Sequence, residues 1–165
     1  MTDHDDDFFD DAKSEFPSKE DLKDRLVAIF ATGPVGQRKS EASGKPYDYV
    51  ETVTVVLDDG PNHDMSTELV PSVDATGRAQ VLPGFQWSTT GVVSRVKPRV
   101  DTEKALRPLI GRINSMPNKR KGFSDAWSIA TPTEADKEIA RRYRAQLDKV
   151  RADLLAADDR EPEFV

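Results

Sequence analysis

The sequence has no cysteine, only two histidines and no long run of apolar residues. The absence of cysteine excludes disulfides, thiolate metal sites and cysteine nucleophiles, and it fits a reducing cytoplasm. His4 and His63 lie in polar stretches, so we expect no histidine-based metal or catalytic centre. No segment approaches the ~18 apolar residues of a membrane-spanning helix, and residues 1–11 lack a signal pattern. We therefore expect a cytoplasmic protein without a membrane partner.

Apolar residues are few for a globular chain of 165 residues: 36% are hydrophobic and 33% are charged. This composition predicts a small folded core with disordered ends. We divide the chain into a disordered acidic N-terminal tail, a β-domain, a C-terminal helix and an acidic C-terminal tail. The expected boundaries are 1–16, 17–130, 131–157 and 158–165.

The net charge of −6 is distributed unevenly along the chain. Residues 1–24 carry a net charge of −7, whereas residues 86–130 carry nine basic and three acidic residues, a net charge of +6. A basic middle between acidic ends is more informative about partners than the total charge, and it points to an anionic ligand such as nucleic acid.

Two apolar stretches near the start predict strands. Residues 25–33 are apolar and end at Gly33-Pro34, after which we expect a flexible loop. Residues 47–60 alternate, with Tyr47, Tyr49, Val53, Val55 and Leu57 on an apolar face and with Asp48, Thr52 and Thr54 on a polar face.

The remaining β-elements are shorter. Residues 79–87 predict a third strand interrupted at Pro83-Gly84. Residues 88–97 predict a short helix that ends before Pro98. A hairpin follows, with strands at 109–114 and 123–130 joined by a basic loop.

The C-terminal helix has the clearest pattern. Thr131, Pro132 and Glu134 predict its N-terminus. An apolar stripe at spacings of 4, 4, 3 and 4 then runs along one side, through Ile139, Tyr143, Leu147, Val150 and Leu154. The stripe is longer than a small barrel needs, which leaves a homodimer through this helix as an alternative to packing alone.

Together these elements predict a mainly β (α+β) fold, a small OB-type five-stranded Greek-key barrel with a C-terminal α-helix. A split α+β sandwich is the alternative. We expect no enzyme, because Gly33–Ser40 lacks the spacing of a Walker A motif and no nucleophile–base pair can be argued from spacing. We expect no cofactor and no metal.

Three segments carry a resemblance to a known family: "PSKEDLKDRLVAI", "VETVTVVLDDG" and "WSIATPTEADKEIARRYR". Together they resemble the OB-fold single-stranded DNA-binding proteins of actinobacteriophages, over about Pro17 to Arg144. The chain departs from that pattern at residues 61–84, where a clean third strand is expected. The ending "DDREPEFV" is similar to the acidic, aromatic-ended tails of such binders, although here Val165 follows the aromatic residue.

The resemblance implies a non-catalytic, sequence-tolerant single-stranded DNA-binding protein that supports phage DNA replication or recombination in the host cytoplasm. It also implies that the acidic tail recruits replication or recombination proteins. The tail residues concerned are Asp158, Asp159, Glu161, Glu163 and Phe164. The alternatives are an adaptor that acts through its acidic-aromatic ends, which include Asp5–Asp11, and a structural virion component.

A binder of single strands needs cations for the phosphates and flat side chains for the bases. The phosphate candidates are Lys45, Arg95, Lys97, Arg112, Lys119, Arg120 and Lys121. The stacking candidates are Tyr47, Tyr49, Trp87 and Phe123, with Trp87 expected to be exposed and Trp127 expected in the core. Two alternatives stay open: the cationic loop is a solvated hairpin tip, and one of the two tyrosines belongs to the core.

Overall fold

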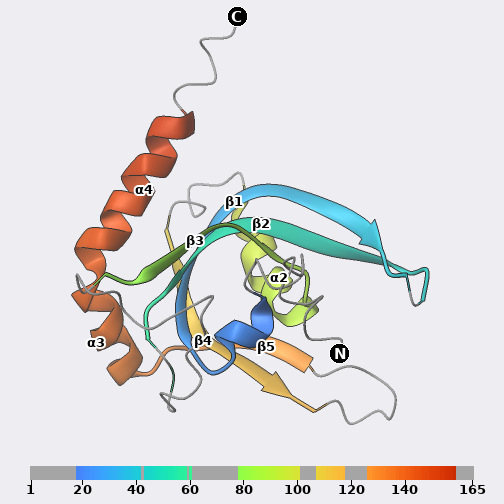
Figure 1. Ribbon diagram of the computed structural model, residues 1–165, viewed down its shortest axis with the longest axis horizontal. Helices are drawn as coiled ribbons and strands as arrows, with labels where there is room; N and C mark the ends of the chain where they lie inside the picture. The colour runs from blue at the N-terminus through green and yellow to red at the C-terminus, as the bar shows by residue number, and fades with distance from the viewer. Residues whose placement is uncertain are drawn as a thin grey trace, which may run out of the picture.

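A computed structural model describes residues 18–41, 43–58, 60, 78–100, 107–117 and 126–158. As predicted, the fold is mainly β with additional helices (Figure 1). The elements, in chain order, are η2 Lys19–Leu22, β1 Leu26–Lys39, β2 Pro46–Val56, β3 Gln80–Trp87, α2 Thr90–Val96, η4 Lys97–Arg99, β4 Leu109–Met116, β5 Ala126–Ala130, α3 Glu134–Arg142 and α4 Arg144–Asp158.

The five strands form one antiparallel sheet in the order β3-β2-β1-β4-β5. The first three strands form a meander, and β4 then returns to pair with β1 on its other side. A spatial order of 4-1-2-3 is a Greek key. Within the described residues the sheet is open, with β3 and β5 as its edges.

Strand β1 is longer than predicted, because the chain does not leave the sheet at Gly33-Pro34. The β1–β2 register shifts between Ala31 and Val35, which marks a bulge. Gly33 adopts a φ of 62°, and a bulge is a place where a strand tolerates proline. The strand therefore bends and continues to Lys39, paired with β2 along its whole length.

Both faces of the sheet are buried near its centre. One face packs against α2 and includes Val27, Ile29 and Val50, and the other packs against α3 and α4 and includes Phe30 and Val55. Figure 1 shows α2 within the curve of the sheet and the C-terminal helices on the opposite side. Residues 26–31 form a continuous apolar run in the sequence because successive side chains of the strand pack into the two cores on opposite faces of the sheet.

The polar face predicted for the second strand is wrong. Thr52 and Thr54 are fully buried in the core beside α2. Their hydroxyl oxygens are 2.8 Å apart, and the Thr52 hydroxyl donates to the carbonyl of Phe85 at 2.8 Å. The Trp87 indole N–H donates to Thr54 Oγ1 at 3.1 Å. These hydrogen bonds remove the cost of burying the two hydroxyls.

The exposure predicted for Trp87 is also wrong, since only 1% of its surface is accessible. Its ring packs against that of Phe85 with centroids 4.9 Å apart. The polar residues that follow Trp87 in sequence belong to the turn before α2, so they do not indicate exposure of the strand that precedes them.

The C-terminal helix begins two residues later than predicted and has a break. Thr133, not Thr131, is the N-cap: its hydroxyl accepts from Asp136 N at 3.1 Å, and its own N–H donates to Asp136 Oδ2 at 3.0 Å. Tyr143 separates α3 from α4.

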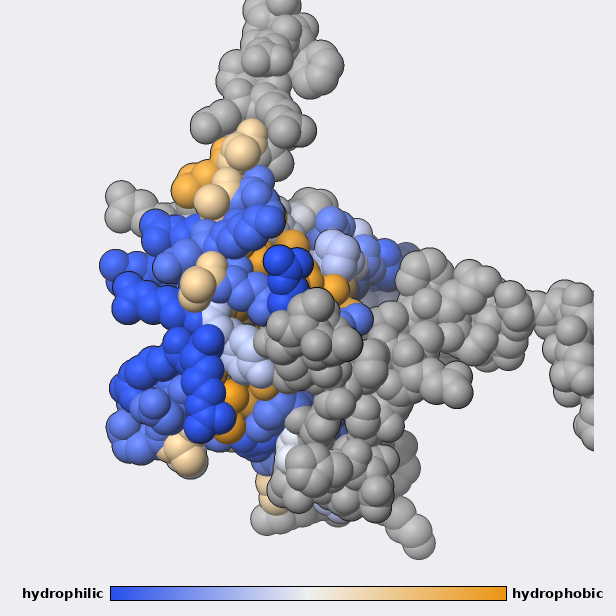
Figure 2. Space-filling view, turned by 60° about the vertical axis from the view of Figure 1, so that its left-hand side comes forward, coloured by the Kyte–Doolittle hydropathy of each residue, from blue (hydrophilic) through white to orange (hydrophobic). Residues whose placement is uncertain are grey.

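The predicted apolar stripe on this helical segment is confirmed, because all five of its residues pack in the core on the helical side of the sheet. Figure 2 brings this side of the molecule forward and shows that its outer surface is mostly hydrophilic. Within the part of the chain that the structure describes, no helix is both long enough and apolar enough to cross a membrane.

Candidate nucleic-acid interface

The far ends of β1 and β2 form a two-stranded arm, made of residues 36–39 and 46–49, that extends away from α3 and α4 (Figure 1). The bulge in β1 separates this arm from the part of the sheet that carries both cores. A turn closes its tip: Ser40 N donates to the Lys45 carbonyl at 2.9 Å and Gly44 N to the Ser40 carbonyl at 2.7 Å. The arm therefore presents side chains to solvent on a hairpin with a hydrogen-bonded turn.

One face of the arm carries two aromatic rings and a guanidinium. Tyr47 is 37% exposed and Tyr49 is half-buried. Gly36 lies opposite Tyr49, and a Cβ at Gly36 would fall 2.3 Å from Tyr49 Cζ. The ring of Tyr49 thus occupies the space above Gly36, where it contacts the Arg38 guanidinium at 4.1 Å from the ring centroid. Arg38 fixes the ring through a cation–π contact and adds positive charge beside it.

The opposite face of the arm carries Asp48, because side chains alternate along a strand. Lys97, in the turn after α2, donates to Asp48 Oδ2 at 2.6 Å, and Gln37 donates to its other oxygen at 3.2 Å. The hydrogen bonds from Lys97 and Gln37, with the charge of Lys97, hold the pKa of Asp48 below its usual value. The carboxylate therefore stays ionised and ties Lys97 to the arm.

Three of the predicted residues, Lys45, Tyr47 and Tyr49, thus lie together on the arm. Lys45 is exposed at its tip. Lys97 touches the arm from the face opposite the rings, and Arg95 is exposed on α2, two residues earlier. The rings and these two cations do not share one face, as a single groove would require.

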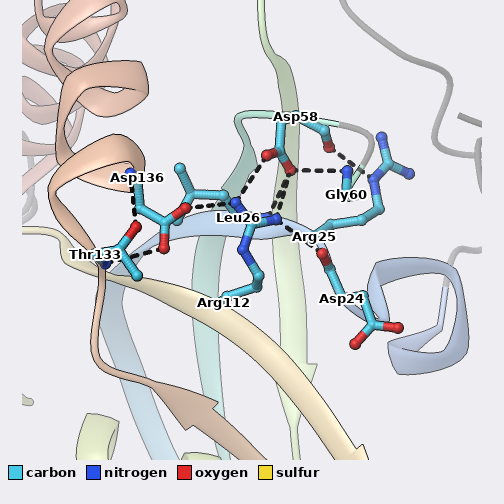
Figure 3. A network of polar contacts seen from close by, with 8 residues as sticks. All are labelled: Asp24, Arg25, Leu26, Asp58, Gly60, Arg112, Thr133 and Asp136. Carbon is cyan, nitrogen blue, oxygen red and sulfur yellow. Dashed lines mark hydrogen bonds and ion pairs between the residues drawn. The ribbon is translucent and has the colours of Figure 1, made fainter. Parts of the chain in front are cut away.

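Arg112 does not lie on the arm but joins three parts of the fold (Figure 3). Its two terminal nitrogens donate to the carboxylate oxygens of Asp58 at 3.3 and 3.0 Å, so the pair is bidentate. The same guanidinium donates to Asp136 Oδ1 at 2.6 Å and to the carbonyl of Asp24 at 2.9 Å. Arg112 therefore links β4 to the end of β2 and to the first turn of α3.

Two members of this network, Asp136 and Arg112, are held in the charged state. Burial would raise the pKa of Asp136, but hydrogen bonds from Arg112 and from the Thr133 backbone outweigh burial and hold this pKa below its usual value. Burial would lower the pKa of Arg112, whereas its hydrogen bonds to Asp136 and Asp58 raise it. A guanidinium shared by two carboxylates is a structural contact, and Arg112 is not part of the arm.

The other predicted residues lie elsewhere. Trp87 is sealed in the core, as described above, and has no surface for a base. Trp127, expected in the core, is partly buried and packs against the core beside α2, and Lys19 lies above its ring at 5.5 Å from the centroid. Asp158 ends α4. The remaining predicted residues lie outside the described residues: Lys119, Arg120, Lys121, Phe123, Asp159, Glu161, Glu163 and Phe164.

Sequence reasoning missed the role of Arg38, because residues 34–40 were expected to form a loop. A signal was present in the length of the second strand: eleven residues, Pro46–Val56, need a partner of similar length. Continuing the first strand through Pro34 places Arg38 opposite Tyr47 and Gly36 opposite Tyr49.

Comparisons of the chain with protein-family models, with curated proteins and with solved structures find no match.

Proposed function

We propose that this protein is a non-catalytic, sequence-tolerant single-stranded DNA-binding protein that serves phage DNA replication or recombination in the host cytoplasm. The observation that carries the proposal is the arm, on which Tyr47, Tyr49 and Arg38 share one face beside Lys45. In this proposal the acidic tail recruits proteins of the same processes.

The topology supports an OB-type barrel as the finer description of the fold. The Greek key of four strands, the helix between β3 and β4 and the fifth strand beside β4 are the parts of such a barrel. Lys19 contributes to a pocket along β3 and also covers the ring of Trp127 on β5, so η2 lies between the two edges of the sheet.

In OB-type binders the loop between the first two strands and the loop between the last two border the nucleic-acid site. Here the first of these loops is the tip of the arm, residues 40–45, and the second contains the basic run Lys119–Lys121. The outer face of the sheet next to the arm is covered by α3 and α4. Bases are therefore expected to stack on the arm rather than on the central sheet.

The chemistry of the arm fits a single strand better than a duplex. Bases in a single strand expose their faces, and each base stacked on an aromatic side chain contributes about 1–3 kcal/mol. The arm beyond the bulge is only two strands wide, roughly 5 Å between strand axes. A flexible single strand can contact the rings on one face and Lys97 on the other, whereas a duplex cannot bend over so narrow a ribbon.

Fluorescence anisotropy with a labelled oligo(dT) and the full chain tests the proposal. Tyr47→Ala should weaken binding by about 5- to 140-fold, which corresponds to the loss of one stacking contact worth about 1–3 kcal/mol. Tyr47→Phe keeps the ring and should bind far more tightly than Tyr47→Ala. As a charge control, Arg142→Ala with Lys149→Ala removes two exposed cations from the C-terminal helices and should cause a much smaller loss than Arg38→Ala with Lys45→Ala.

Absence of oligo(dT) binding at low salt would refute the proposed function. If the two pairs of charge variants lose DNA affinity equally, exposed cations contribute wherever they lie on the surface. The arm would then not be the interface.

A further inference from the structure

A second concave site lies on the other side of the molecule, between α3, α4 and the start of β4. It is a groove of about 510 Å³. Apolar residues line it, and they are Phe30, Pro108, Ile110, Pro132, Ala140 and Leu147. The volume falls within the usual range for ligand pockets, about 300–1,000 Å³.

Cations surround this apolar lining. Five of the lining residues are basic, namely Arg107, Lys137, Arg141, Arg144 and Arg151, against the single carboxylate of Asp148. Figure 2 shows hydrophobic atoms between strongly hydrophilic side chains on this side of the molecule. An apolar floor with a cationic rim fits a ligand that combines apolar groups with several negative charges.

Three of the five rim cations form ion pairs with neighbouring carboxylates, and these pairs are weak. Lys137 pairs with Glu134 at 3.4 Å, Arg141 with Glu138 at 2.9 Å and Arg144 with Asp148 at 3.9 Å. All three pairs are largely exposed, and such pairs contribute about 0–1 kcal/mol each. An anionic ligand can therefore redirect these side chains at small cost.

We propose that this groove binds the acidic-aromatic segment Asp5–Asp11 of the same chain. The segment, "DDDFFDD", places five carboxylates around Phe8 and Phe9. Its charge complements the five basic residues of the rim, and its two rings supply the apolar groups for the floor. The segment lies outside the described residues.

The lining favours a peptide over nucleic acid. Single strands bind where aromatic rings are exposed to stack with bases. The one aromatic residue in the lining is Phe30, and its side chain has no accessible surface. The groove thus offers apolar contact area and charge but no stacking platform.

A peptide titration on the full chain tests the proposal. The probe is a fluorescein-labelled peptide of residues 3–13, and binding is followed by anisotropy. The receptor is the full chain with Phe8→Ser and Phe9→Ser, in which the chain's own segment can no longer compete. We expect this receptor to bind the probe at least fivefold more tightly than the wild-type chain does.

Two matched controls separate a built site from general attraction between opposite charges. Arg141→Glu with Arg144→Glu reverses two cations of the rim and should weaken probe binding at least tenfold. Arg142→Glu with Lys149→Glu makes the same change of charge at exposed positions of the same helices that do not line the groove. This pair should weaken probe binding less than threefold. A probe that carries serine at both phenylalanine positions keeps every carboxylate, and its affinity for the receptor should be at least tenfold lower. This comparison changes only the peptide and leaves the groove intact.

Four outcomes would overturn the proposal. The first is that the wild-type chain and the Phe8→Ser/Phe9→Ser chain bind the probe with equal affinity. The second is that the two charge-reversal pairs weaken probe binding equally, and the third is that a peptide of residues 158–165 binds more tightly than the probe does. The fourth is that oligo(dT) displaces the probe and that Arg141→Glu/Arg144→Glu weakens the binding of both ligands equally, which would assign the groove to DNA.

Discussion

Replacing Arg112 with alanine should be among the most destabilising substitutions of a charged residue in this fold. The substitution leaves Asp58 and Asp136 facing each other without the guanidinium that they share (Figure 3). It also removes the hydrogen bond to the Asp24 carbonyl, which belongs to a residue in the left-handed region, with a φ of 63°. The contact with Asp136 also ties the first turn of α3 to the sheet, in addition to the apolar packing of that helix.

The expected magnitude follows from the number of contacts and from their burial. Hydrogen bonds to charged groups contribute about 1.5–3 kcal/mol each, and Arg112 makes them to two carboxylates. The Arg112 side chain is 25% exposed, so water compensates part of the loss. We therefore expect Arg112→Ala to lower the free energy of unfolding by about 2–4 kcal/mol.

Urea unfolding followed by tryptophan fluorescence measures this change. Arg141→Ala is the matched control, because Arg141 also donates to a carboxylate, at 2.9 Å, but both partners are 61% exposed. That variant should lose no more than about 1 kcal/mol. Equal losses in the two variants would refute the reasoning, since burial and the shared guanidinium would then make no difference.

The pH dependence provides a second check on the network. The pKa of Asp136 is lowered in the folded state, so its ionised form stabilises the fold above the unfolded-state pKa of about 3.9. This stabilisation disappears as the pH falls through the folded-state pKa. The difference in the free energy of unfolding between the wild type and Asp136→Asn should therefore be constant near neutral pH and shrink below about pH 4. A difference independent of pH would contradict the assignment.

Three further changes test other parts of the structure. Gly36→Ala should displace the Tyr49 ring, because the new Cβ falls 2.3 Å from Tyr49 Cζ, and oligo(dT) binding by anisotropy should weaken by about 1–3 kcal/mol. Thr54→Val removes the acceptor of the buried Trp87 N–H and should lower the free energy of unfolding in urea by about 1–3 kcal/mol. Thr32→Val, at an exposed position, is the control and should change this free energy by no more than about 0.5 kcal/mol. Replacing Lys119, Arg120 and Lys121 with alanine should reduce the slope of log affinity against log salt by up to about 2 if all three contact phosphates, and an unchanged slope would exclude the loop from the interface.

The sequence predicted those elements whose signals are local. The short helix before Pro98 and the stripe from Ile139 to Leu154 are confirmed. In each of these elements, neighbours within about four residues decide the structure.

The features that the sequence did not predict depend on partners far away in the chain. Gly33-Pro34 ends a strand by local rules, yet pairing with β2 carries the strand through a bulge. Thr52 and Thr54 look like an exposed face until β3, about thirty residues away, supplies their partners: the Phe85 carbonyl accepts from Thr52, and the Trp87 N–H donates to Thr54. Arg112 was a phosphate candidate by charge alone, and only the fold brings Asp58 and Asp136 to it.

The same limit applies to the candidate site. The alternation of Tyr47 and Tyr49 with Asp48 follows from the strand period, and their grouping with Lys45 was predicted. Their separation from the central sheet was not, because it arises from the bulge in the partner strand. Nor could charge counting show that Lys97 is tied to Asp48 on the face opposite the rings.

Crosslinking of the full chain to an oligonucleotide that carries 5-iododeoxyuridine tests most directly whether the arm binds single-stranded DNA. Irradiation joins this base to aromatic rings in contact with it, and mass spectrometry locates the adduct. We predict adducts at Tyr47 or Tyr49, reduced by an excess of unlabelled oligo(dT) and not by duplex DNA. Adducts confined to the C-terminal helices, or competition by duplex as strong as by single strands, would contradict the proposed interface.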